Sequence, residues 1–162
     1  MSLSRAVSLV VLVTAALGIA HPASADITAF MGSTQSPSRR SAQGGAIGIS
    51  LLVVGFEFEY SDTSENAQSN APGLQSSMFN VLVQTPFAVP RMQFYGTVGG
   101  GLYRERIGGS QDTGFGSNIG AGLKVSLVGP VRVRLDYRTF RLGRDSAARS
   151  PRRVYVGLNI AF

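Results

Sequence analysis

The segment Val131–Arg138 reads VRVRLDYR and alternates apolar and polar residues at every position. Because successive side chains of an extended strand point to opposite faces, this period of two predicts a strand with one apolar and one charged face. The apolar face comprises Val131, Val133, Leu135 and Tyr137, and the charged face comprises Arg132, Arg134, Asp136 and Arg138. The same alternation recurs at 55–60, 115–127 and 153–162, and no apolar stripe at helical spacing follows residue 26. The sequence therefore predicts an all-β protein.

Weaker alternation adds further segments, so that eight strands are expected in all. They lie at about 26–34, 43–51, 54–61, 77–86, 92–105, 114–127, 131–141 and 153–162. The expected connections alternate between long polar loops, at 35–42, 62–76, 106–113 and 142–152, and short turns, at 52–53, 87–91 and 128–130. Leu52-Val53 is poor turn chemistry, because neither residue favours a positive φ. The pattern is typical of antiparallel strands that run up and down in sequence order.

The composition limits the class of protein. The 162 residues are 44% hydrophobic and 15% charged, with a net charge of +6, which is too apolar for a disordered chain and long enough for one domain. The sequence contains no cysteine, so a disulfide scaffold and a thiolate metal site are both excluded.

The first 25 residues have the features of a cleaved signal peptide. Arg5 precedes an apolar run at 6–20, and the small residues at 23–25 fit a cleavage site. The run is shorter than the roughly 20 residues that a membrane-spanning helix needs, although an N-terminal membrane anchor is the alternative. We expect cleavage after residue 25, export from the cytoplasm and a single mature domain at 26–162.

Three features of the polar face and the apolar face indicate that the apolar face lies outside. The polar face is crowded with small residues that suit a narrow lumen, namely Gly48, Ser50, Gly99, Gly101, Gly120, Gly122, Gly157 and Ala161. Its charges balance, and we expect them to form an ion-pair network in the lumen from Glu57, Glu59, Glu105, Lys124, Arg132, Arg134, Asp136 and Arg138. The aromatic residues of the apolar face gather near its two ends, as at two membrane interfaces, and are Tyr60, Phe79, Phe115, Phe94 and Phe162.

An apolar exterior decides the architecture. Lipid satisfies no backbone hydrogen bonds, so strands that cross a membrane must close into a barrel without edges. We therefore expect an eight-stranded antiparallel up-and-down transmembrane β-barrel. A barrel of this size has an interior that its own side chains fill.

The closing segment Tyr155–Phe162 (YVGLNIAF) carries the sharpest resemblance to a known family. Gly157 is followed three and five residues later by Ile160 and Phe162, which resembles the C-terminal assembly signal of the small OmpA/OmpX-like outer-membrane β-barrels. Tyr155 departs from this pattern, because a polar residue usually holds its place. The resemblance covers 26–162. It implies recognition by the barrel-assembly machinery and insertion into a Gram-negative-type outer membrane.

Enzymatic chemistry has little support in the sequence. The only histidine, His21, lies in the expected signal peptide, so the mature chain lacks a His-assisted serine mechanism and a His-ligated metal. Glu57 and Glu59 could be an acid/base pair, but counter-charges for lumen arginines are the simpler interpretation. We expect no catalytic residues, no metal, no cofactor and no nucleic-acid partner.

Arginines gather in or beside the first and fourth long loops, which become neighbours when a barrel closes. Arginine binds phosphate bidentately, so we expect these residues to contact lipopolysaccharide phosphates in the outer leaflet, the alternative being ordinary solvated loop charge. Arg104 shares the lipid-facing side near this rim and could snorkel outward. The expected set is Arg39, Arg40, Arg104, Arg144, Arg149, Arg152 and Arg153.

Three functions stay open at this point. The leading prediction is a non-enzymatic outer-membrane barrel in envelope structure or surface interaction, with 62–76 as a mobile exposed loop. A narrow water or small-ion channel is the second, and a filled lumen speaks against it. The third is an exported soluble barrel of lipocalin type, which would require Leu135 and Tyr137 to point inward.

Overall fold

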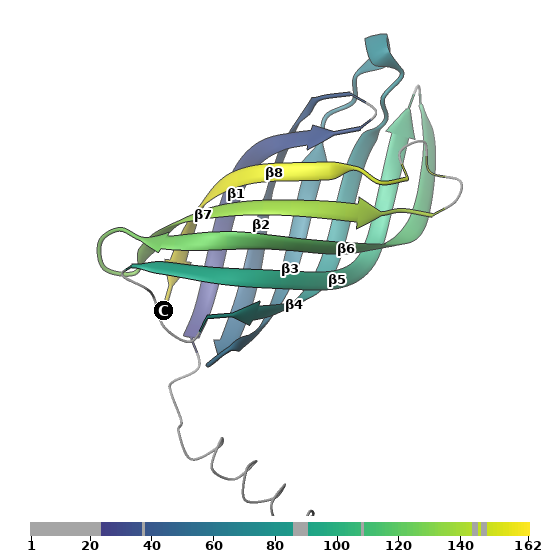
Figure 1. Cartoon of the computed structure of the whole chain (residues 1–162). Coiled ribbons are helices and arrows are strands. Elements are labelled where there is room, and N and C mark those ends of the chain that lie inside the picture. The colour runs from purple at the N-terminus through teal and green to yellow at the C-terminus, as the bar shows by residue number, and fades with distance from the viewer. Residues whose placement is uncertain (1–23, 37, 86–90, 108, 144–145, 147–148) are drawn as a thin grey trace, which may run out of the picture.

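Eight antiparallel strands close into one barrel in the computed structural model (Figure 1), which describes residues 24–36, 38–85, 91–107, 109–143, 146 and 149–162. The strands are β1 (Ser24–Gln35), β2 (Arg40–Leu51), β3 (Val54–Thr63), β4 (Gly73–Gln84), β5 (Met92–Ile107), β6 (Ser110–Ser126), β7 (Val131–Arg141) and β8 (Arg152–Ala161). Each strand pairs with its neighbours in sequence, and β8 returns to pair with β1. The predicted fold class is confirmed.

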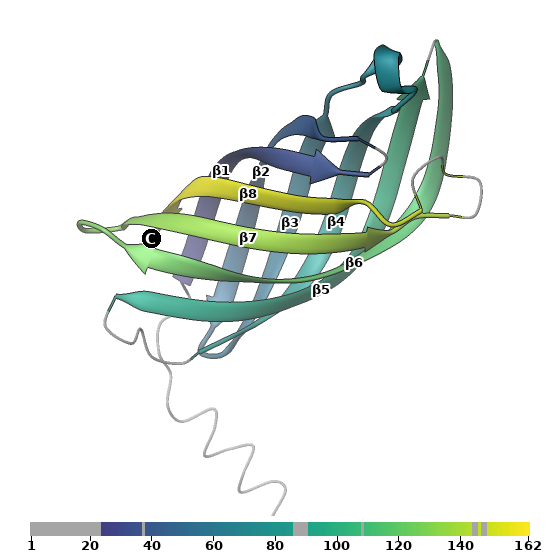
Figure 2. The same ribbon diagram turned by 45° about the horizontal axis from the view of Figure 1, so that its top comes forward.

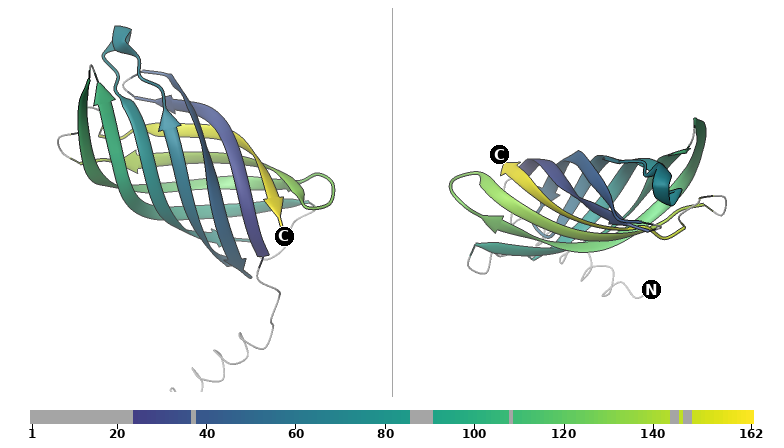
Figure 3. Two further views of the ribbon diagram at one scale, coloured as in Figure 1. Left: turned by 180° about the vertical axis from the view of Figure 1, so that it is seen from behind. Right: turned by 90° about the horizontal axis from the view of Figure 1, so that it is seen from above.

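The two walls of the barrel cross at an angle. Strands β1–β4 run steeply and β5–β8 run nearly across the view in Figure 1, and the turned views in Figures 2 and 3 show the same crossing. A closed sheet requires this tilt. The closing seam extends from Asp26 opposite Ala161 to Gln35 opposite Arg152. None of the eight described strands is therefore left with a free edge.

The strands extend beyond their predicted bounds, chiefly at the long-loop end. The predicted loop at 106–113 is wrong, because Ile107 pairs directly with Ser110 and only 108–109 separates β5 from β6. The missed signal is the Gly108-Gly109 pair, which is typical of a two-residue hairpin turn. These strand ends carry polar residues on both faces, so backbone pairing continues where the apolar alternation has stopped.

The predicted turns at 52–53 and 128–130 are confirmed. Leu51 pairs with Val54, and Leu52 adopts a φ of 54° despite its unfavourable side chain. The Leu127 N–H donates to the Val131 carbonyl at 2.9 Å across the second turn. Most of the predicted turn at 87–91 lies outside the described residues.

Two further connections differ in detail from the prediction. The loop between β3 and β4 spans 64–72 and contains a short 3₁₀ helix, η1 (Ala67–Ser69). Strand β1 begins at Ser24, so it includes two residues that the expected cleavage would remove. Ala25 exchanges backbone hydrogen bonds of 2.8 and 2.9 Å with Phe162. Residues 1–23 lie outside the described part of the chain, and signal-peptide cleavage stays a prediction. No helix of the described residues is long and apolar enough to span a membrane.

The outer surface of the barrel is apolar on all eight strands. Leu135 and Tyr137 are both 46% exposed, and each of the five aromatic residues assigned to the apolar face is exposed. The lipocalin-like alternative, which requires these side chains to point inward, is therefore wrong. The polar residues of the alternating pattern point into the barrel instead, and they form its core.

Candidate functional site in the barrel lumen

The barrel interior holds ten buried side chains of Asp, Glu, Lys and Arg among the described residues, five acidic and five basic. They are Asp26, Glu57, Glu59, Glu105, Asp136, Arg40, Lys124, Arg134, Arg138 and Arg153. Seven of the eight predicted network residues belong to this set. The exception is Arg132, which is half-buried at the short-turn end and makes no ion pair with a described residue. The prediction that Arg132 joins the network is therefore wrong, and the balance comes from Asp26, Arg40 and Arg153.

Glu57 and two arginines of β7 form the centre of this network. Both terminal nitrogens of Arg134 bind the Glu57 carboxylate, one of them at 3.2 Å from Oε1. Arg138 Nη2 donates to Glu57 Oε1 at 2.9 Å, and Arg138 Nε donates to Asp136 Oδ1 at 2.9 Å. The alternation of β3 and β7 places all four side chains in the lumen. Paired and hydrogen-bonded charges of this kind are tolerated in a core.

A second layer lies next to it toward the long-loop end and is built around Arg153 of β8. Its guanidinium binds the Glu59 carboxylate and donates to Ser61 Oγ at 2.6 Å. The same guanidinium lies 5.1 Å from the ring centroid of Phe30 and 4.9 Å from that of Phe140. Arg138 joins the two layers, since its Nη1 lies 3.0 Å from Glu59 Oε2.

Two tyrosines pack against the arginines inside the barrel. The Tyr95 hydroxyl donates to Asp136 Oδ2 at 2.5 Å and accepts from Arg134 Nε at 2.7 Å. Tyr155 stacks on Phe30 with ring centroids 4.1 Å apart. Sequence reasoning missed Tyr95 and Phe30 because it searched the inner face for charge. Counting by twos along 26–34 and 92–105 would have found both.

Separate ion pairs and polar contacts fill the two ends of the lumen. Lys124 Nζ donates to Asp26 Oδ2 at 2.6 Å at the short-turn end. At the other end Ser146 Oγ donates to Glu105 Oε1 at 2.5 Å, near the buried Arg40. Neutral pairs add to the filling, as when Asn118 Nδ2 donates to Asn80 Oδ1 at 2.8 Å, and the hydroxyls of Ser61 and Ser76 lie 2.8 Å apart.

This arrangement is that of mutual counter-charges. Glu57 and Glu59 share a face as predicted, but arginine guanidinium groups bind both carboxylates. In the described part of the chain, no group of three or more His, Cys, Asp or Glu could hold a metal ion. The geometry therefore presents a packed polar core, in which eight of the ten buried charged side chains form ion pairs with one another.

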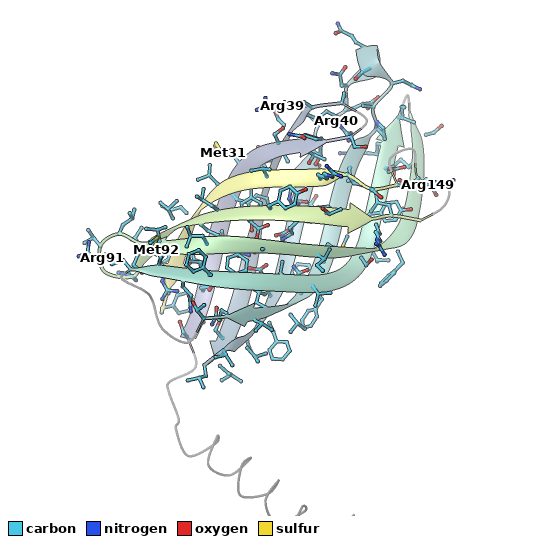
Figure 4. The ribbon with its side chains drawn as sticks, in the orientation of Figure 1. Met31, Arg39, Arg40, Arg91, Met92 and Arg149 are labelled. Carbon is cyan, nitrogen blue, oxygen red and sulfur yellow. The ribbon has the colours of Figure 1, made fainter. Side chains whose placement is uncertain are left out.

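The predicted arginine rim divides into two groups. Arg39, Arg104, Arg149 and Arg152 are exposed at the long-loop end, and Figure 4 shows Arg39 and Arg149 projecting there. Arg144 lies outside the described residues. Placing Arg40 and Arg153 on the rim is wrong, because they are only 4% and 2% exposed and point into the lumen. The alternation of β8 already placed Arg153 on the polar face, whereas Arg40 was missed because β2 was expected to begin at 43.

The predicted assembly signal occupies the last strand. Tyr155 points inward, Ile160 and Phe162 are 43% and 71% exposed on the outer face, and Gly157 lies against β1. A Cβ on Gly157 would lie 2.9 Å from the Ala29 carbonyl oxygen, so close packing against β1 favours glycine there. Recognition by assembly machinery stays a prediction.

At the sequence level, no protein-family model and no curated protein matches the chain. Its fold, however, matches that of Neisserial surface protein A (NspA) with a TM-score of 0.70 and 16% identity, over 86% of this chain and 97% of that one. The chain has the fold of the small outer-membrane β-barrels. The N-terminal β-barrel domain of Pseudomonas aeruginosa OprF matches with a TM-score of 0.61 and 20% identity, again over 86% and 97%. The outer-membrane enzyme PagL matches with a TM-score of 0.51 and 15% identity, over 83% and 98%.

These matches bear on the fold of the small outer-membrane β-barrels and on nothing narrower. They confirm the expected resemblance to the OmpA/OmpX-like barrels as one of architecture. Because an enzyme is among the proteins that share this fold, the fold leaves open whether the chain is catalytic.

Proposed function

We propose that the chain is an integral outer-membrane β-barrel protein with a lumen plugged by its own side chains, acting without catalysis in envelope structure or surface interaction. One observation carries the proposal: every strand exposes large apolar side chains outward, while the described interior holds five acidic and five basic side chains, most of them ion-paired. This is the reverse of a soluble protein and suits a barrel surrounded by lipid. The long connections then face the cell surface and the short turns face the periplasm.

The contacts across the lumen favour a plug over a channel. Arg134 and Arg138 reach from β7 to the opposite wall at Glu57, and both arginines are fully buried. Stacked rings of Phe30 and Tyr155 occupy the space beside them. A continuous path for ions would have to break these buried pairs, each at considerable cost.

The absence of catalysis in this proposal rests on the same contacts. The sequence has no cysteine, and His21 is its only histidine. The carboxylates that could serve as acid or base, Glu57 and Glu59, are each held by two arginines in the plugged lumen. A general base must reach a substrate proton, and these groups face each other instead.

We also infer that the exposed arginine rim binds the phosphates of lipopolysaccharide. Arg39 directly precedes β2 and Arg152 begins β8, so these two exposed arginines flank the long-loop end of β1, and Arg104 is exposed near the outer end of β5. Guanidinium groups at this height meet the phosphorylated headgroups of the outer leaflet. Barrel-assembly machinery and outer-membrane lipid are the other partners of this proposal.

Cell fractionation tests the location. We expect the mature chain in the outer-membrane pellet, with a gel mobility that changes on boiling because the folded barrel resists detergent. Recovery in the soluble periplasmic fraction without detergent would refute the proposal.

Planar-bilayer recording tests the plug. The purified protein is expected to show no steady single-channel step, whereas a reproducible unitary conductance in the wild-type protein would establish the channel instead.

Copurification of lipopolysaccharide tests the rim. When Arg39→Gln, Arg104→Gln, Arg149→Gln and Arg152→Gln are combined, less lipopolysaccharide should copurify. Retention equal to wild type would remove the rim from the proposal.

A further inference from the structure

The outer wall of the barrel carries a hollow centred on β1, which we call the β1 groove. Its floor is formed by Ala29 and Gly45, which lie side by side on β1 and β2. Leu158 pairs with Ala29 on one side, and Tyr60 pairs with Gly45 on the other. The groove has a volume of about 730 Å³ and a lining that is mostly apolar.

Larger side chains border the floor along the strand direction. One pair further toward the long-loop end, Met31 lies opposite Gln43, and both line the groove. Met31 is 70% exposed and points away from the barrel in Figure 4. A second hollow of about 570 Å³ continues from there and adds Ser41 and Ser64 to its lining. The depression is thus apolar at mid-height and becomes polar toward the long-loop end.

Packing within the barrel does not require a residue as small as glycine at position 45 of this floor. A Cβ built on Gly45 would meet its nearest neighbour, the Thr28 carbonyl oxygen, at 3.4 Å, which is ordinary contact. The adjacent Gly44 differs, because its Cβ would lie 2.2 Å from the Tyr60 carbonyl oxygen. The wall therefore closes only with glycine at Gly44, whereas Gly45 leaves the outer surface hollow although an added Cβ would fit there.

Two arginines stand at the polar end of the same face. Arg152 pairs across the seam with Gln35, at the end of β1, and Arg39 Nε donates to Ser33 Oγ at 3.2 Å. Both arginines are exposed. Strands rise by about 3.3 Å per residue, so Ser33 lies roughly 7 Å above Met31 along β1. The two arginines thus lie beyond the polar end of the groove. The one acidic residue that lines both hollows, Asp62, is ion-paired with Arg106 at 3.2 Å, so its charge is already compensated.

We propose that the β1 groove binds one lipid A molecule, with an acyl chain over Ala29 and Gly45 and a phosphate at Arg39 and Arg152. The assignment rests on the proposed function, which places this end of the barrel in the outer leaflet. The two arginines attract the phosphate by opposite charge. The apolar hollow, which barrel packing does not require, accommodates the acyl chain. The proposal thus defines one binding site for the lipid, whereas the arginine rim as a whole provides only a general attraction.

Filling the floor tests the groove. The protein is purified in mild detergent, given lipid A, and examined by native mass spectrometry, where wild type is expected to carry one lipid A. Gly45→Leu should weaken binding about tenfold or more, because expelling two methylenes of the acyl chain already has that effect. Ala29→Leu fills the same floor from β1 and should act alike, which keeps the test valid if one variant folds poorly.

Gly96→Leu is the matched control for the added side chain. Gly96 is exposed on the outer wall of β5, and a Cβ there would meet nothing closer than 4.0 Å. It should bind lipid A as wild type does. Combined Arg39→Gln and Arg152→Gln should weaken lipid A but leave dephosphorylated lipid A unchanged.

Four results would overturn the groove assignment. The first is unchanged lipid A binding in both Gly45→Leu and Ala29→Leu, and the second is a loss of lipid A binding in Gly96→Leu equal to that in Gly45→Leu. The third is binding of phosphatidylglycerol as tight as that of lipid A. The fourth is a wild-type dimer that Gly45→Leu dissociates, which would assign the groove to a second copy of the chain. Outer-membrane fractionation of each variant separates the two proposals. If fractionation succeeds while the lipid assay fails, only the groove is refuted; if wild type is soluble, both are.

Discussion

Glu57 and Arg134 meet across the full width of the barrel. Their strands, β3 and β7, lie four places apart in a ring of eight and share no backbone pairing. The two side chains nevertheless form a bidentate ion pair, and they are only 2% and 0% exposed. This pair joins opposite walls that the backbone connects only around the circumference.

Removing one partner of that pair should destabilise the barrel strongly. Glu57→Gln is expected to lower the free energy of unfolding by about 3–5 kcal/mol, because Asp136 and Glu59 alone then face Arg134, Arg138 and Arg153, and one buried positive charge is left uncompensated. Urea unfolding in detergent, followed by the heat-modifiable gel band, measures this. Asp112→Asn makes the same chemical change on an exposed residue of β6 and should stay within about 0.5 kcal/mol of wild type. Equal effects would contradict a cross-lumen pair.

The same substitution should destabilise the barrel strongly at Arg153 and hardly at all at the neighbouring Arg152. Among the described residues, two arginines lie within 4.0 Å of Glu59, namely Arg138 and Arg153. Arg153→Met removes one of them and should lower the free energy of unfolding by about 3–5 kcal/mol. Arg152→Met changes an exposed residue and should cost at most about 0.5 kcal/mol while reducing lipopolysaccharide retention. Comparable stability of the two variants would place Arg153 outside the lumen.

Two of the buried tyrosines, Tyr95 and Tyr155, provide a test of hydrogen bonding. The Tyr95 hydroxyl bonds to Asp136 and Arg134, so Tyr95→Phe should lower the free energy of unfolding by about 1–3 kcal/mol. The Tyr155 hydroxyl is buried and has no hydrogen-bond partner among the described residues. Tyr155→Phe should therefore be neutral or slightly stabilising in the same urea titration. A large loss in Tyr155→Phe would reveal a partner for that hydroxyl.

Two glycines of β5 should behave differently when a methyl group is added. A Cβ on Gly99 would lie 2.1 Å from Asn80 Oδ1 and 2.4 Å from the Phe79 carbonyl oxygen, so Gly99→Ala should cost about 1–3 kcal/mol. Gly96 has open space, and Gly96→Ala should be neutral or should stabilise by about 0.4–1 kcal/mol by restricting the unfolded chain. Thermal unfolding of the two single variants decides the matter, and an equally stable Gly99→Ala would contradict the tight contact.

Most of the barrel wall could be predicted from local pattern alone. The strand at 131–141 is predicted at its observed bounds, since its alternation is unbroken. The ends of the strands are harder to predict. The chain around Ile107 and Ser110 continues to pair where neither face is apolar, and hydropathy carries no signal for backbone bonds outside the apolar belt.

The network was predictable in membership and only partly in pairing. Glu57, Arg134 and Arg138 follow from parity, because every second residue of a strand must face the lumen. Arg132 has the same parity, yet it lies at the mouth of the barrel. Parity says which face a residue occupies but not how deep it lies, so it wrongly adds Arg132 to the network. Arg153 was assigned to a loop by its charge when its position in the strand already placed it inside.

The amino-acid sequence by itself determined the all-β class, the eight strands and the direction in which most side chains point. These depend on a period of two, which is a local property of an extended backbone. Tertiary structure alone decided that Glu57 meets Arg134, that Arg153 lies between Phe30 and Phe140, and that Ala29 and Gly45 form a hollow. Such contacts join residues far apart in the chain, and only the closure and tilt of the barrel bring them to the same height.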